Sequence, residues 1–304
     1  MIKSKSLSLT NWPKEDKHAW QQAFQTGGWF DECGLAAHWK ENSRKNIQYS
    51  YGVWLHFIQN QFPKLLEQKL AKRVHRAIVK DYLADLKTRV SHNTATIFLD
   101  HLLCALRVMA PDHEWQWLRD LVRHYQRDVT PKNKQARIVS TARLVELGET
   151  LMTEADADVS RAVVRPARLF RDCLLISLLA LRPLRRRTLA LIQIDKHLVK
   201  TRSGYSLVFK ACDTKNKRPL EFRLPHILNE AMTRYLETYR PRFPNANTHD
   251  YLWISSKGGQ LSDSAIYTNV MKHTHEKLGV AINLHLFRDC AASTMATENP
   301  EHVL

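Results

Sequence analysis

The period at which apolar residues recur changes along the chain, and this change restricts the fold more than any other feature of the sequence. Between Asn42 and Arg127 apolar side chains recur every three to four residues, as on the buried faces of amphipathic helices. Between Tyr205 and Leu224 they instead alternate with polar residues, as in strands that bury one face. We therefore expect a helical bundle followed by a domain in which helices accompany a small antiparallel sheet.

Composition and turn signals divide the chain into four predicted regions. Residues 1–40 are rich in tryptophan and are expected to form an N-terminal helical extension. Residues 41–127 are expected to be a helical bundle with short connections. Residues 128–141 are basic, contain a proline and lack apolar periodicity, which favours a linker, either solvated or lying along a polyanion. Residues 142–304 form the predicted α+β domain, so the whole fold is expected to be mostly α with one small antiparallel sheet.

The second domain shows several helix signals. The segment Cys173–Leu181 is apolar almost all round, as expected of a buried helix. A further helix is predicted after Pro225, and another from a cap at Ser262 to a stop at Gly279. A last helix is expected to begin around His285.

The charge balance points to a polyanionic partner. Lys and Arg number 46 against 30 Asp and Glu, a formal net charge of +16. Such a protein attracts nucleic acid first and an anionic membrane surface second, although a merely basic protein would share this balance. The five cysteines are scattered and lack C-x-x-C spacing, and no apolar run is long enough to span a bilayer. Reduced thiols and a cytoplasmic location are therefore expected.

Three local patterns, in a fixed order, carry candidate chemistry. The first is the arginine-rich turn 181–191, which follows the buried helix directly. The second is the segment Asp213–Pro219, which reads DTKNKRP and lies in a turn between two predicted strands. The third is His285-Leu286-Phe287-Arg288 at the start of the last predicted helix. Each pattern alone is common, because clustered arginines and turn lysines are usually only solvated.

Together these patterns resemble the tyrosine recombinase family, which includes the phage integrases. The family has an arginine in an L-R turn, then a T-K-x-x-K/R hairpin, then H-x-x-R. The resemblance covers roughly residues 140–304, and the preceding bundle is similar in pattern to the family's SAM-like core-binding domain. It implies site-specific recombination or integration of DNA, as in phages and other mobile elements. The resemblance implies no metal, because arginines take the place of a divalent ion, and no ATP, because the family conserves bond energy in a 3′-phosphotyrosine. No other cofactor and no small-molecule substrate are expected.

The family's first arginine matches Arg185 better than its neighbours. With Arg185 in that place, Thr188, Leu189 and Ile192 fall at the later motif positions without a gap, whereas Arg182 would need one. Thr188 stands where the family has a glutamate, so a supporting carboxylate is not expected at this position.

The resemblance implies a role for each matching residue. Arg185 and Arg288 would hold the non-bridging oxygens of one phosphate bidentately, since guanidinium groups stay protonated. His285 would lie one helical turn from Arg288 and donate to the phosphate or move a proton. Lys215 would protonate the departing 5′-oxygen, with Lys217 as the alternative.

Double-stranded DNA is the expected partner, and further basic residues are expected to contact its backbone. These residues are Lys72, Arg73, Lys132, Lys134 and Lys217. The resemblance also implies a homotetramer on DNA for a full-length chain.

The family's nucleophilic tyrosine follows the H-x-x-R motif, whereas no tyrosine follows Tyr267 here. We therefore expect a chain that ends before its nucleophile and binds DNA without cleaving it. The alternative is a non-catalytic DNA-binding protein or regulator derived from the same fold. A metal-dependent nuclease would need clustered acidic ligands, and a nucleotide-driven enzyme would need a G-x-x-x-x-G-K-[ST] loop; the sequence shows neither.

Overall fold

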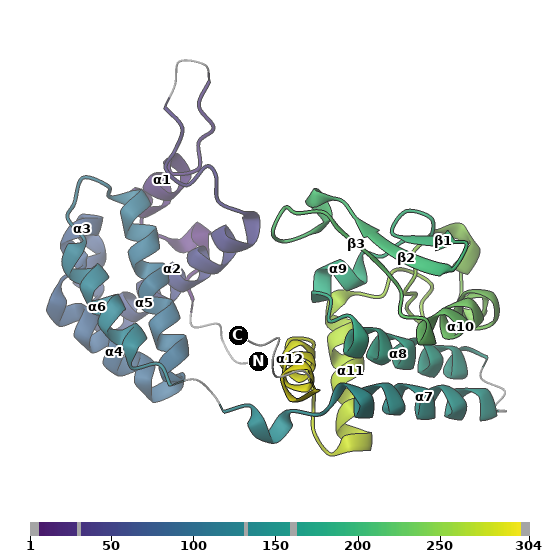
Figure 1. The fold of residues 1–304 in the computed structure, drawn as a ribbon. Helices are drawn as coiled ribbons and strands as arrows, with labels where there is room; N and C mark the ends of the chain where they lie inside the picture. The colour runs from purple at the N-terminus through teal and green to yellow at the C-terminus, as the bar shows by residue number, and fades with distance from the viewer. Residues whose placement is uncertain (1–5, 29–31, 131–132, 159–162, 299–304) are drawn as a thin grey trace. The chain divides into compact units, whose positions relative to one another are not determined.

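A computed structural model describes residues 6–28, 32–130, 133–158 and 163–298. The chain divides into two compact units, unit 1 (Met1–Lys132) and unit 2 (Asn133–Leu304), and each has its own hydrophobic core (Figure 1). Within the described ranges no helix is both long and apolar enough to cross a membrane.

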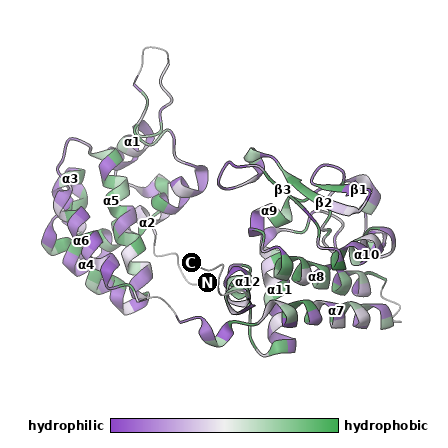
Figure 2. Ribbon diagram, in the orientation of Figure 1, coloured by the Kyte–Doolittle hydropathy of each residue, from purple (hydrophilic) through white to green (hydrophobic). Residues whose placement is uncertain are grey.

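Unit 1 is built from helices that follow the predicted apolar stripes. They are α1 (Lys14–Gln22), α2 (Glu41–Gln61), α3 (Leu70–Arg73), α4 (Arg76–Arg89), α5 (His92–Met109) and α6 (Gln116–Arg127). The hydroxyl of Ser91 accepts a hydrogen bond from the Thr94 amide at 3.3 Å and so caps the start of α5. Both hydrophobic and hydrophilic stretches are visible along these helices (Figure 2), as expected of elements that bury one face.

Tryptophans from the region before residue 40 pack into the bundle core. Trp12 and Trp20 are buried, and the Trp12 ring lies 4.9 Å from the ring of Tyr51 on α2. Trp54, also on α2, packs edge-on against Tyr82 of α4, with 5.0 Å between ring centroids. The described part of the first region therefore shares one core with the helices that follow it.

A buried ion pair joins α1 to α3 inside this core. The Arg73 guanidinium donates to both carboxylate oxygens of Asp16, at 2.7 and 2.5 Å, and to the carbonyl of Gln68 at 2.8 Å. The Tyr51 hydroxyl donates to the same carboxylate at 2.8 Å. Arg73 is 1% exposed, so the prediction that it contacts DNA is wrong: its charge is already used inside unit 1.

Unit 2 combines helices with one small sheet. Its helices are α7 (Thr141–Ala157), α8 (Val164–Leu181), α9 (Arg186–Ala190), α10 (Ile227–Arg234), α11 (Asp263–Leu278) and α12 (Leu286–Glu298), and a π-helical turn, Tyr235–Tyr239, continues α10. The predicted cap and stop of α11 are confirmed: Ser262 accepts from the Ala265 amide at 3.2 Å, and Gly279 is left-handed with φ 73°.

Helix α8 forms the centre of unit 2. Every residue from Phe170 to Ala180 is buried, and α7, α10, α11 and α12 all contact this helix. In Figure 1, α7 and α8 lie side by side. Gly148 of α7 permits this close approach, because a Cβ there would lie 1.9 Å from the hydroxyl oxygen of Ser177 on α8.

The sheet is antiparallel, in the order β1 (Leu198–Thr201), β2 (Gly204–Phe209) and β3 (Leu220–Arg223). Leu207 on the central strand lies opposite Leu198 and Phe222. The alternation seen in the sequence corresponds to β2 and β3, while β1 has no comparable signal. The predicted fold class, mostly α with a small antiparallel sheet, is confirmed.

Candidate phosphate-binding site

A pocket of about 290 Å³ brings together the three sequence patterns in unit 2. We call it the arginine pocket. It is lined by Leu184, Arg185, Thr188, Thr214, Asn216, Arg218, Pro219, Leu220 and Arg288. Three of these residues are arginines and none is acidic, so the site favours an anion.

The turn after α8 places Arg185 at the edge of the pocket. Leu184 and Leu189 are buried on either side of this arginine and anchor the turn to the core. The Trp253 indole donates to the carbonyl of Leu189 at 3.0 Å and fixes the short helix α9. Arg185 is the extended residue before α9 and is half-buried. The backbone that carries Arg185 is thus anchored to the core of unit 2.

Arg288 reaches the pocket from the first turn of α12. Leu286 and Phe287 are each 1% exposed and anchor this turn, and the Asn283 side chain accepts from the Leu286 amide at 3.0 Å. Burial, together with the positive charge of Arg185, lowers the pKa of Arg288. Two like charges held this close repel each other, and an anion between them would relieve that repulsion.

The loop between β2 and β3 closes the pocket. The Thr214 hydroxyl lies 2.7 Å from the carbonyl oxygen of Arg218 and accepts from the Arg218 amide at 3.1 Å. Lys217 takes a left-handed conformation with φ 53°. These features turn the chain so that Asn216 and Arg218 line the pocket.

The predicted site residues fall into two groups. Arg185 and Arg288 line the arginine pocket. Lys215 and Lys217 are exposed on the loop that borders it, and His285 is exposed just before α12; none of these three is among the lining residues. Their proposed roles stay predictions.

Arg218 and Asn216 line the pocket although neither was singled out from the sequence. The signal for Arg218 was present, because this residue occupies the last position of the T-K-x-x-K/R pattern. Asn216 lies at one of the variable positions of that pattern and carried no signal.

The lysines outside the pocket that are predicted to contact the DNA backbone differ in their surroundings. Lys72 is exposed on α3. Lys132 lies outside the described residues. Lys134 donates to the Asp289 carboxylate at 2.8 Å and keeps half of its side chain exposed.

The segment around Lys134 runs along α12. Beyond the Lys134–Asp289 pair, the Val139 amide donates to the Cys290 sulfur at 3.4 Å. The Thr141 amide donates to the Thr294 hydroxyl at 2.9 Å. Three successive contacts therefore fasten this segment to the helix that carries Arg288.

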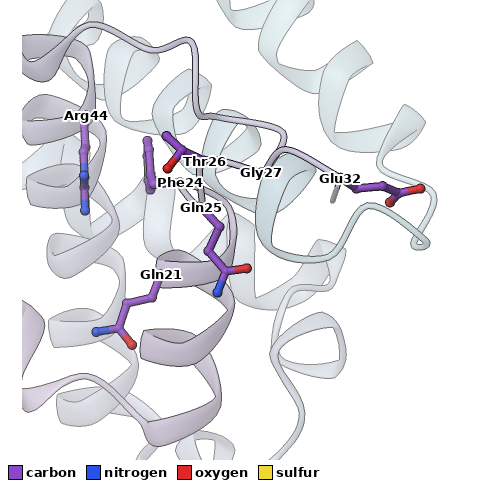
Figure 3. Close-up of a pocket in the computed structure, with 7 residues that line it drawn as sticks. All are labelled: Gln21, Phe24, Gln25, Thr26, Gly27, Glu32 and Arg44. Carbon is purple, nitrogen blue, oxygen red and sulfur yellow. The ribbon is translucent and has the colours of Figure 1, made fainter. Parts of the chain in front are cut away.

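A second hollow lies in unit 1, with a volume of about 550 Å³. Figure 3 shows Arg44 stacked on Phe24 while Glu32 points away from both. The Arg44 guanidinium carbon lies 4.1 Å from the Phe24 ring centroid, so the cation already has an aromatic partner. Among the described residues no three His, Cys, Asp or Glu side chains gather as metal ligands.

Comparison with known proteins gives a likeness of fold. No protein-family model matches the sequence, and no curated protein matches it. The XerH site-specific recombinase bound to difH substrate in a pre-cleavage complex matches at a TM-score of 0.58 and 15% identity, over 95% of this chain and 88% of that one. The post-cleavage XerH complex with palindromic difH substrate gives 0.56 and 13%, over 94% and 84% of the two chains.

XerA recombinase gives a TM-score of 0.40 and 14% identity, over 87% of this chain and 81% of that one. The two XerH structures therefore carry the comparison. They show that this chain shares the fold of the XerH site-specific recombinase.

Proposed function

We propose that this protein binds double-stranded DNA as a member of the tyrosine recombinase family, with a role in site-specific recombination. The observation that carries the proposal is the arginine pocket, where Arg185, Arg218 and Arg288 converge without an acidic residue among the lining side chains. A backbone phosphate is the anion that a DNA-binding protein of net charge +16 meets most often. The shared fold with XerH, a recombinase bound to difH substrate, supports the same reading.

The pocket suits a phosphate in a reacting geometry. Two guanidinium forks can each donate two hydrogen bonds to non-bridging oxygens, and both stay charged as negative charge gathers on those oxygens. Arg185 and Arg288 take this role, and Arg218 adds a third positive charge. In the family's cleavage reaction Lys215 on the bordering loop would be the proton donor to the departing 5′-oxygen, and His285 would be a further donor to the phosphate.

The test compares Arg288→Gln with a matched variant, Arg165→Gln. Arg165 lies at the other end of α8, about 24 Å along the helix from Leu181 at 1.5 Å per residue, and its side chain is 75% exposed. Both changes remove one positive charge from unit 2. We expect Arg288→Gln to reduce the slope of log affinity against log salt by about one, and Arg165→Gln to leave it unchanged.

Fluorescence anisotropy of a labelled duplex, titrated at several salt concentrations, measures both slopes. Equal slopes for the two variants would show that the arginine pocket does not contact the DNA, and would contradict the proposal.

We further propose that the 304-residue chain binds DNA without cleaving it. No tyrosine is among the described residues that line the arginine pocket, so the pocket presents no aromatic hydroxyl to a phosphate bound there. Incubation with a nicked duplex, followed by denaturing electrophoresis, is expected to show no covalent protein–DNA product. A band that survives denaturation and disappears after protease treatment would contradict this proposal.

A further inference from the structure

A buried imidazole lies beneath the loop that closes the arginine pocket. His197, just before β1, is 3% exposed, and its ring stacks on Phe209 of β2 with 5.6 Å between ring centroids. The backbone amide of Gln193 donates a hydrogen bond to Nδ1 of His197 at 3.1 Å. Because Nδ1 accepts this bond, the neutral ring carries its hydrogen on Nε2.

The Nε2 hydrogen of His197 faces one carboxylate. Nε2 lies 3.6 Å from Oδ2 of Asp213, and it has no hydrogen-bond partner at normal distance in the described parts of the chain. Burial lowers the pKa of His197, although the charge of Asp213 opposes this effect. A buried N–H of this kind costs free energy unless an acceptor approaches it.

Asp213 in turn fixes the base of the loop. Its Oδ2 accepts from the Lys210 amide at 2.9 Å, which closes the turn Ala211–Asp213 at the end of β2. Thr214 follows directly, and its hydroxyl closes the loop onto Arg218. A continuous chain of contacts thus leads from His197 through Asp213 and Thr214 to Arg218 in the pocket.

We propose that His197 is a positioning residue, which acts through Asp213 to hold the loop 214–218 against the arginine pocket. The inference rests on the proposed function only in assigning the loop a role, namely to bring Arg218 and Lys215 to a bound phosphate. Whether His197 holds the loop 214–218 closed can be tested without DNA.

Trypsin reports directly on the loop, because Lys215 and Lys217 are exposed cleavage sites within it. Cleavage after these two residues needs the loop to open, and its rate follows the open population when opening is fast. His197→Phe keeps an aromatic ring against Phe209 and removes the N–H that faces Asp213. We expect it to raise the rate of cleavage after Lys215 and Lys217 about twofold, because a contact of 3.6 Å is weaker than an ordinary hydrogen bond.

Two further variants separate positioning from general loosening. His197→Gln offers an amide N–H in place of the ring N–H and is expected to restore most of the protection. His249→Phe changes another imidazole of unit 2, one that bonds the Gly258 carbonyl at 2.8 Å, and is expected to leave loop cleavage unchanged. Mass spectrometry of the fragments assigns each cut.

A double-mutant cycle with Asp213→Ala tests the route. If His197 acts through Asp213, His197→Phe is expected to change the rate of loop cleavage very little in the Asp213→Ala background. Unchanged cleavage in His197→Phe, or an equal increase in both backgrounds, would overturn the proposal. Should His197→Phe fail to fold, Asp213→Asn carries the test: it removes the carboxylate charge and is expected to raise loop cleavage.

The outcomes of this experiment and of the Arg288→Gln titration are independent. Loss of loop protection with no duplex binding would refute the proposed function and leave the role of His197 standing. Normal duplex binding, with loop cleavage unchanged in His197→Phe, would refute the role of His197 and leave the proposed function standing.

Discussion

Replacing Asp16 with alanine is expected to lower the free energy of unfolding of unit 1 by about 3–5 kcal/mol. The change leaves the Arg73 guanidinium buried without its counter-ion, since Arg73 is 1% exposed and both of its terminal nitrogens donate to Asp16. The Tyr51 hydroxyl loses its acceptor at the same time. A stable domain has only about 5–15 kcal/mol in total, so the loss is a large share of it.

Urea denaturation followed by tryptophan fluorescence measures this effect. Trp253 is the one tryptophan of eight that lies after residue 132, so the signal reports mainly on unit 1. Glu41→Ala is the control, because Glu41 pairs with Lys45 at 2.6 Å but is 77% exposed, and its loss is expected to leave the midpoint unchanged. Equal midpoint shifts for Asp16→Ala and Glu41→Ala would contradict the prediction.

The double variant Asp16→Leu with Arg73→Met is expected to recover much of the stability. Removing both charges takes away the unpaired ion, and apolar side chains of similar volume often replace a buried ion pair without loss.

The affinity for duplex DNA is expected to fall by about 10³–10⁵ between 50 and 200 mM salt, if roughly six to ten phosphates are contacted. Each neutralised phosphate releases condensed counter-ions, and the excess of 46 basic over 30 acidic residues supplies the charges. We expect the arginine pocket to bind one of these phosphates and exposed residues such as Lys72 to contact others.

Anisotropy titrations at several salt concentrations give the slope. Anionic lipid vesicles serve as the control polyanion, because a membrane surface is the main alternative partner for a basic protein. A flat response with duplex DNA, or tighter binding to vesicles than to duplex at equal salt, would count against a DNA-binding role.

Local signals were enough to predict the elements that frame the pocket. Ser262 and Gly279 mark the ends of α11 in the sequence, and both make the capping contacts expected of their residue types. The alternation of Tyr205, Leu207 and Phe209 likewise predicted β2. These features depend on neighbouring residues, so one sequence is enough to find them.

Features that depend on distant partners were missed. Arg73 and Lys72 look alike in the sequence, and only the approach of Asp16, 57 residues away, buries one and leaves the other exposed. Strand β1 has four residues and one buried side chain, Leu198, which is too short for a period to show. Its position is set by pairing with Leu207.

The candidate site shows the same division. The choice of Arg185 over Arg182 agrees with the residues that line the pocket, whereas Arg182 lies over the Phe222 ring at 5.7 Å. The i, i+3 spacing of His285 and Arg288 predicts that the two side chains share one face of a helix. The helix begins only at Leu286, so that spacing did not bring His285 among the lining residues.

The contacts of residues 134–141 with α12 connect the beginning of unit 2 to the helix that carries Arg288. Asp289, the partner of Lys134, directly follows Arg288, and the partners of Val139 and Thr141 are Cys290 and Thr294, one and five residues beyond Asp289 on the same helix. A displacement of residues 134–141 would therefore be transmitted to α12 through these contacts. Substitutions or deletions in residues 134–141 should consequently alter the position of Arg288 as well as the length of the connection between the two units.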